Sequence, residues 1–461
     1  MTTKLKWVRL VALMALLAIV AAACAADDGD GDEETEAAGA EETEAPAEET
    51  EAEETAPTEE EATEEATAED TEEAAASGDG EALQLAYVLP ETGQLAFLGP
   101  PIIAGFELAV EDINAAGGTN GVPVKSDGGD EGDGDGTIAN QTVDRLLADG
   151  VDVIMGAASS GISLTIIDKV TGAGVVQCSP SNTSPTFTNY EDNGLYFRAA
   201  PTDALQGPVL AEQIVAAGGT NVAVLARADD YGQGLLDSTE AALTEAGASV
   251  AVATTYDPMA QSFDAEVQQV VDSGADAVAL ISFDEGARIL QTMIERGVGP
   301  ADVIVFGADG TASNDFPEEV DPNNPGILQG MRTTSPAPAT NEDFISTLTE
   351  FAPDIADTLF AAEGYDCTVA AALAAVAGGA NDAQTVADNM VAVTTEGTKC
   401  TAYAECLELL EGGEDIDYDG VSGPLDFTDA GEPSQGSYAV GEFNAEGDLD
   451  TIETITSTLD G

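Results

Sequence analysis

The stretch GAASSGISLTIIDKVTGAGVVQCSPSNTSP, residues 156–185, contains two small-residue loops separated by one helix-length segment. Residues 152–155 form a short β-branched run before it, and Ser159 and Ser160 directly precede apolar residues at helical spacing, which predicts a helix start. Glycines end this helix, a second apolar run follows, and two prolines bracket hydroxyl-rich residues in the loop 179–185. The order strand, helix, strand predicts two parallel strands whose following loops share one edge of a sheet.

Hydroxyl-rich residues in both loops predict a ligand site at this edge. A helix N-terminus there offers free backbone N–H groups and a partial positive charge to an anion such as a carboxylate, and small side chains let the ligand approach the backbone. Serine and threonine also commonly cap helices and populate loops, so either loop alone has a purely structural explanation. Two such loops after adjacent strands favour a ligand site.

The N-terminal part of the chain has features of export and no foldable core. Residues 1–23 combine three basic residues with a following apolar run, which predicts a signal peptide. Cys24 follows three alanines, as in a bacterial lipobox, which predicts its lipidation; ordinary secretion with cleavage after the alanines is the alternative. Residues 24–80 are predicted to be an acidic disordered tether, because residues 25–80 hold 25 acidic and no basic side chains and no aliphatic side chain larger than alanine.

Composition excludes several classes of function for the remaining chain. Residues 81–461 hold 63 acidic and 9 basic side chains, which argues against binding to nucleic acid or to anionic membrane surfaces. The chain has no histidine and no Cys-x-x-Cys or Cys/His zinc spacing, so Ser160 has no ordinary general base. No GxSxG, SxxK or P-loop pattern is present either. We therefore expect no enzyme, no cofactor and no metal.

One acidic segment imitates a calcium site. The residues that match EF-hand positions are Asp415, Asp417, Asp419, Gly420 and Asp426. The last position normally supplies a bidentate glutamate, and the segment reads as strand where an EF-hand has a helix. Calcium binding from Asp415 to Asp426 stays an open, weak alternative.

Two series of alternating strand and helix patterns follow one another, the first to about residue 200 and the second beyond it. In the first, residues 122–124 read as a short edge strand and residues 127–136 as a Gly/Asp-rich loop. Near the end of the chain, residues 423–431 read as a strand and turn. The two series predict an α/β fold with two Rossmann-like lobes, each with a parallel sheet, and a cleft between their carboxyl edges.

Four cysteines remain besides the lipobox cysteine, and in an exported chain they predict disulfides with three possible pairings. Cys400 and Cys406 would lie about 9 Å apart along the axis of an unbroken helix, beyond the roughly 7 Å limit for a disulfide. Turn-like residues at 397–401 precede the predicted helix, so we expect these two to pair. Cys178 is then left to pair with Cys367.

Six segments, in this order, resemble the substrate-binding proteins of branched-chain amino acid ABC transporters, the leucine/isoleucine/valine-binding type. They are FLGPPIIAGFELAVEDINAAGG, QTVDRLLADGVDVIMGAASSG, SPSNTSP, FRAAPTDALQG, DDYGQG and GVSGPLDF, and the match covers residues 82–450. The resemblance implies the type I periplasmic binding fold, with three hinge crossovers near residues 199–202, 329–334 and 431–438. The implied lobes are discontinuous: residues 81–200 and 333–432 form lobe 1, and residues 201–332 and 433–461 form lobe 2.

The resemblance also implies the contacts to the ligand. The matching positions are Ser160, Ser181, Thr183, Tyr231, Phe283 and Asp309. The two serines and the threonine, all in lobe 1, would hold an α-carboxylate. Lobe 2 would contribute Tyr231 and Asp309, with Asp309 as the counterion of the α-ammonium. Phe283 stands where the family often has tyrosine, and Leu98 where well-known members have an aromatic residue, so the side-chain specificity is open.

The function that the resemblance implies is solute capture for transport. The protein would lie outside the cytoplasm, anchored to the outer face of the cell membrane through its lipid, and would capture a small amino acid of the branched-chain class in the cleft. The closed form would then deliver the ligand to the permease and ATPase subunits of an ABC transporter. Urea, short amides or another small polar solute are the alternative ligands, and a ligand-sensing surface receptor is the alternative role.

Overall fold

The structure is a computed structural model and describes residues 80–132, 136–337 and 341–459. The predicted signal peptide, Cys24 and residues 24–79 of the predicted tether lie outside the described residues. Within the described ranges, none of the helices has the length and apolar character that crossing a membrane requires.

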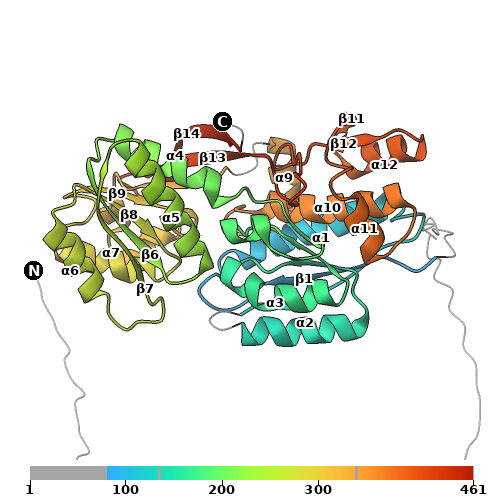
Figure 1. Ribbon diagram of the computed structural model, residues 1–461, viewed down its shortest axis with the longest axis horizontal. Coiled ribbons are helices and arrows are strands. Elements are labelled where there is room, and N and C mark those ends of the chain that lie inside the picture. The colour runs from blue at the N-terminus through green and yellow to red at the C-terminus, as the bar shows by residue number, and fades with distance from the viewer. Residues whose placement is uncertain (1–79, 133–135, 338–340, 460–461) are drawn as a thin grey trace, which may run out of the picture. The chain divides into compact units, whose positions relative to one another are not determined.

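Two sheets flanked by helices organise the described chain (Figure 1). The first has five strands, in the order β2 (Lys125–Asp130), β1 (Gln84–Leu89), β3 (Val153–Gly156), β4 (Val176–Ser179) and β5 (Tyr196–Arg198). The second has seven, in the order β14 (Leu449–Thr458), β13 (Gln435–Phe443), β10 (Arg332–Pro336), β9 (Ile304–Gly307), β8 (Ala277–Ile281), β6 (Asn221–Arg227) and β7 (Ser249–Tyr256). The predicted α/β class with parallel sheets is confirmed.

Helices cover both faces of the first sheet, whose strand pairs are all parallel. The helices of this part are α1 (Gly99–Ala115), α2 (Thr137–Asp149), α3 (Ser160–Gly172), α9 (Glu342–Phe351), α10 (Ala361–Gly378), α11 (Ala383–Asn389) and α12 (Tyr403–Glu411). Successive residues of β1 point to opposite faces: Leu85 belongs to the core with α1 and α10, and Ala86 to the core with α2 and α3. The strand β1 therefore contributes to two separate apolar layers.

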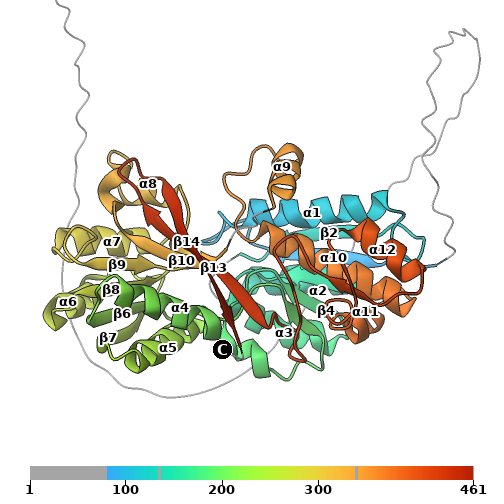
Figure 2. The ribbon, with the colours of Figure 1, turned by 90° about the horizontal axis from the view of Figure 1, so that it is seen from above.

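The second sheet combines parallel and antiparallel pairs. Its helices are α4 (Asp203–Ala216), α5 (Asp230–Glu245), α6 (Asp264–Ser273), α7 (Gly286–Glu295) and α8 (Phe316–Val320). Val224 of β6 packs with α4 and α5, and its neighbour Leu225 packs in the core with α6 and α7. Figure 2 shows β10, β13 and β14 side by side; β13 pairs antiparallel with both of its neighbours, which makes this edge a departure from the purely parallel sheet that we expected.

The chain passes between the two sheets three times, after β5, after β10 and before β13. The second passage lies later than expected, because β10 pairs with β13 over residues 332–336 and with β9 at Arg332 and Thr333. Residues 333–336 thus belong to the second sheet and not to the first lobe. The division into lobes remains our proposal, with this boundary moved to follow residue 336.

Two local expectations were wrong. The edge strand lies at β2 and not at residues 122–124, so part of the expected loop at 127–136 is a strand. An exposed edge strand forms backbone hydrogen bonds to a neighbouring strand on one side only. Glycine suits position 128 of this strand because the ring of Tyr87 lies 2.1 Å from where a Cβ would stand. Residues 423–431 form no strand; isolated bridges pair only Pro424 with Asp419 and Phe427 with Pro433.

Both predicted disulfides are present. Cys178 of β4 joins Cys367 of α10, with their Cα atoms 6.0 Å apart. Cys400, at the end of β11 (Thr398–Cys400), joins Cys406 of α12 over a Cα separation of 5.4 Å. The chain turns between β11, which pairs with β12 (Ile416–Tyr418), and α12, and this turn brings the second pair within disulfide range.

Candidate functional site

All six predicted ligand contacts line one cavity of about 20 Å³, which has room for about one water molecule. They are Ser160, Ser181, Thr183, Tyr231, Phe283 and Asp309, and we call this cavity the site cavity. The loops after β3 and β4 supply the first three residues, and the beginning of α5 and the loops after β8 and β9 supply the others. The carboxyl edges of both sheets therefore meet here, as the order of elements predicted.

Ser159 and Ser160 form the start of α3. Ser159 is its N-cap and accepts the N–H of Ile162 on its side-chain oxygen, which is the helix start that the sequence predicted. The N–H groups of Ala158 and Ser159 are not free for a ligand, because they bond to the carboxylate of Glu131 at 2.5 and 3.2 Å. Sequence reasoning missed this buried acid, which lies just after the unexpected strand β2.

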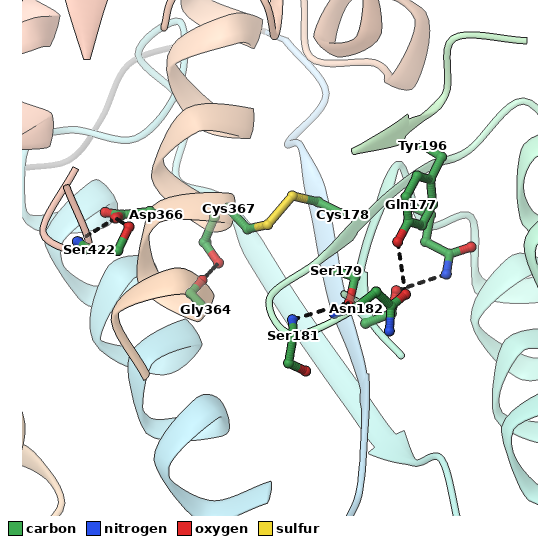
Figure 3. The surroundings of a disulfide bond; sticks show 12 residues. Gln177, Cys178, Ser179, Ser181, Asn182, Tyr196, Gly364, Asp366, Cys367 and Ser422 are labelled. Atoms are coloured by element: carbon green, nitrogen blue, oxygen red, sulfur yellow. Dashed lines mark hydrogen bonds between the residues drawn. A yellow bond between two sulfur atoms is a disulfide. The ribbon is translucent and has the colours of Figure 1, made fainter. Parts of the chain in front are cut away.

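The loop after β4 is fixed by bonds to the loop after β3. The side-chain amide of Asn182 donates to the carbonyls of Ala157 and Ala158, and Ser181 Oγ donates to Ala158. Tyr196 donates its hydroxyl proton to Asn182 Oδ1 at 2.8 Å (Figure 3). The two loops thus form one rigid unit on which the small side chains of the site are placed.

A buried ion pair stabilises these two joined loops. Arg198 and Glu432 are both almost fully buried and paired with each other. Arg198 Nη1 also donates to the carbonyls of Asn182, at 3.2 Å, and Ser184, at 2.8 Å. The guanidinium therefore connects the site loop to the segment at residue 432, far away in sequence.

The Cys178–Cys367 disulfide lies beside the same loop (Figure 3). Cys178 is followed directly by Ser179, whose hydroxyl donates to Ala157 and accepts the N–H of Asn182. Its partner Cys367 lies in α10, whose N-cap Phe360 also lines the site cavity. The crosslink thus ties together two walls of the site.

The second sheet contributes a stacked aromatic pair. The rings of Tyr231 and Phe283 lie 5.4 Å apart and nearly parallel, and the Arg227 guanidinium lies 3.4 Å from the Phe283 ring centroid. The Tyr231 hydroxyl is buried close to Asp309, whose pKa it lowers, and it forms no well-aligned hydrogen bond among the described residues. It is a polar group available to a ligand.

Asp309 lines another side of the site cavity, and a second buried carboxylate, Asp203, lies close enough to affect it without lining the cavity itself. Asp309 accepts a bond from Gln206 Nε2 at 2.6 Å, and burial raises its pKa to about 6. Asp203 is fully buried beside the Thr183 side chain, and in the described part of the chain neither of its carboxylate oxygens makes a well-aligned hydrogen bond. Burial and then the charge of Asp309 raise the pKa of Asp203 well above its usual value. Two neighbouring buried acids favour the binding of a cation.

Sequence reasoning missed Asp203, Gln206 and Phe360. The first two lie within FRAAPTDALQG, a segment that marked the family without assigning a role to each residue. Thr202 caps α4 there, so Asp203 reads from sequence as an ordinary acidic residue of a first helical turn. Phe360 precedes α10 with a left-handed backbone, φ 59°. No residue near it in the sequence predicts this conformation.

The calcium alternative does not fit the structure. Lys399 Nζ lies 2.8 Å from Asp417 and 2.7 Å from Asp419, so a lysine ammonium already occupies the space between these acids. Throughout the described ranges, no group of three or more acidic, cysteine or histidine side chains is arranged to hold a metal ion.

Comparison with known proteins gives consistent results. The family model "Periplasmic binding protein" matches residues 82–448. A Leu/Ile/Val-binding protein homolog of Brucella suis is 29% identical over 311 residues, which covers 66% of this chain and 80% of that protein.

Solved structures show the same fold. The leucine-binding protein LivK from Thermotoga maritima superposes with a TM-score of 0.68 at 20% identity, over 82% of this chain and 99% of that one. The branched-chain amino acid binding protein LivJ from Streptococcus pneumoniae, in complex with isoleucine, gives 0.67 at 21% identity, over 82% and 100%.

Proposed function

This chain belongs to the periplasmic binding protein family, the solute-binding proteins of ABC transporters, and from this we propose that it captures an amino acid as a zwitterion. The family and the fold are those of proteins that bind and release solutes without a chemical reaction. The names of the curated relatives make a branched-chain side chain the first expectation.

The proposal is carried by a group of buried polar atoms around Asp309 that can accept hydrogen bonds from a ligand. Asp309 and the Tyr231 hydroxyl both line the site cavity, and Tyr231 forms no well-aligned hydrogen bond among the described residues; the buried Asp203 and Gln206 adjoin Asp309. An α-ammonium supplies both a positive charge and three N–H donors to such acceptors. Urea and short amides supply no charge, so two buried acids favour the amino acid.

The opposite end of the site suits the α-carboxylate. Ser160, Ser181 and Thr183 are buried in the two joined loops, at the N-terminus of α3. The Ser160 hydroxyl and the helix dipole favour a negative charge there, while Ser181 Oγ donates to the Ala158 carbonyl. An amino acid in this orientation places its α-carboxylate at the N-terminus of α3 and its α-ammonium beside Asp309.

Closure of the proposed lobes would bury the ligand. Arg227 Nη2, at the end of β6, donates to Gln94 Oε1, in the loop after β1, at 3.3 Å, and so bonds across the cleft. The closed form would be the one that the transporter's permease recognises. We also propose that Cys24 carries a lipid, which would hold the protein at the outer face of the membrane with residues 25–80 as the tether.

A thermal-shift screen of the purified chain tests the proposal. Amino acids, urea and short amides would each be added, and a ligand at about 100 times its Kd stabilises the protein by about 2.7 kcal/mol. We expect a clear rise in melting temperature with at least one amino acid and none with urea or the amides. A response to amides alone would replace the amino acid by an uncharged ligand.

Amino-acid affinity is expected to fall as the pH drops below about 6. The pKa of Asp309 is raised to about 6, so its carboxylate is charged above this pH and neutral below it, while the ligand's ammonium stays protonated. Calorimetry at several pH values between about 5 and 8 measures the change. An affinity that stays constant over this range would contradict the counterion role of Asp309.

A further inference from the structure

A second, larger cavity adjoins the site cavity. It measures about 390 Å³, and Leu95, Ser159 and Phe283 line both cavities. We call it the distal cavity; Gln94, Glu131, Arg227, Asp257 and Met259 also line it. A volume of this order accommodates a whole small ligand, and branched aliphatic side chains are far smaller than that.

Part of the distal cavity is apolar. Ile162, Pro258 and Met259 line it together with Leu95 and Phe283. Met259 is 59% exposed, and its unbranched thioether adapts to the shape of what it contacts. Such walls suit the methylene groups of a long side chain, which commonly pack on apolar surfaces while their polar ends reach further.

The cation in the wall is already neutralised. Arg227 Nη1 donates to both carboxylate oxygens of Glu285 at 3.1 Å, and the guanidinium also pairs with Asp229. Its flat surface is covered by the ring of Phe283. Arg227 thus has two acidic partners of its own, and it does not make the cavity a site for an anion.

Glu131 lacks a cationic partner. Its side chain is fully buried and bonds to the backbone N–H groups of Ala158 and Ser159, and burial raises its pKa to about 8. In the part of the chain that the structure describes, neither Glu131 nor Asp257 forms an ion pair. A cation in the cavity would stabilise the charged form of Glu131.

We propose that the distal cavity receives the side chain of the bound amino acid, and that this side chain is long and ends in a cation, as in arginine or lysine. The inference rests on the proposed function, because Asp309 must hold the α-ammonium at the other end. It differs from the first expectation of a branched-chain ligand, since a valine or leucine side chain leaves most of the cavity unfilled. An acidic side chain would meet Glu131 and Asp257.

Calorimetry with the full chain tests whether a positive charge on the ligand's side chain increases its affinity. L-arginine would be compared with L-citrulline, which has the same length and no charge, and with L-leucine. We expect arginine to bind at least about tenfold more tightly than citrulline, the range of one charge-assisted hydrogen bond, and more tightly than leucine. Equal affinities for arginine and citrulline would overturn the cationic preference.

Variants of residues in its wall test whether the ligand's side chain lies in the distal cavity. Met259→Trp fills the cavity from an exposed position, so we expect arginine affinity to fall at least about tenfold more than leucine affinity; Gln261→Trp, exposed in the same loop, is the matched control without effect. Glu131→Gln should bring the ratio of arginine to citrulline affinity towards one, with its melting curve as the check on folding. Should that variant not fold, Met259→Trp still decides the location.

The outcomes separate the two proposals. Tighter binding of leucine than of arginine, or an unchanged arginine affinity in Met259→Trp, would overturn the inference and leave the proposed function intact. If no amino acid binds at all, the proposed function fails as well.

Discussion

Replacement of Asp309 by alanine is expected to weaken amino-acid binding at least about 30-fold. The carboxylate is buried just after β9, lines the site cavity and would be the counterion to the α-ammonium. A charge-assisted contact contributes about 1.5 to 3 kcal/mol, and the loss of one partner of a buried charge pair costs roughly 2 to 5 kcal/mol. Calorimetric Kd values of wild type and variant give the result directly.

Stability should respond differently from affinity in Asp309→Ala. Without ligand, Asp203 and Asp309 disfavour each other's charge, so removal of one acid should cost little fold stability. Asp315→Ala, an exposed acid six residues further along, is the matched control and should bind like wild type. An unchanged Kd in Asp309→Ala would remove the ammonium contact and with it the main reason to prefer amino acids over uncharged amides.

Glu432→Ala is expected to destabilise the protein by roughly 3 to 5 kcal/mol. The substitution leaves Arg198 buried without its counterion, and a buried charge that loses its only ionic partner carries a cost of this size. Arg198 also holds the carbonyls of Asn182 and Ser184, so the site loop should lose its position and ligand affinity should fall too. Denaturant unfolding with and without ligand measures both effects.

A half-exposed ion pair provides the control for Glu432. Arg332 and Glu442 pair at 2.8 Å with about a third of each side chain exposed, so Glu442→Ala should cost at most about 1 kcal/mol. If Glu432→Ala and Glu442→Ala destabilise the protein equally, the Arg198–Glu432 pair does not support the site in the way described.

Sequence reasoning succeeded where local signals and the fold agree. The Ser159 cap, the apolar repeat after it and the bracketing glycines and prolines are all short-range signals, and they located both loops of the site. It failed at β2, where an exposed edge strand carries glycine and aspartate and so has the composition of a loop. Gly128 is there because of Tyr87, a contact between residues far apart in the chain.

The residues missed in the site owe their role to burial, which composition does not reveal. Asp203 has the sequence context of an exposed residue in a first helical turn, yet it is fully buried beside Asp309. Glu131 stands in a Gly/Asp-rich segment of the most ordinary kind for a surface loop. The burial of both residues depends on the second sheet and on the helix α3, which pack around them in the folded protein.

The first sheet and the helix that covers it are widely separated in the order of synthesis. The strands β1 to β5 end at Arg198, while α10, which covers one face of this sheet, begins at Ala361, so the whole of β6 to β10 is made in between. The strands β6 to β10 of the second sheet can therefore pair while the first sheet still lacks α10 and exposes part of an apolar face. That face would be prone to aggregation, and the thiol of Cys178 in it would be open to wrong pairing, until the last quarter of the chain supplies α10 and Cys367.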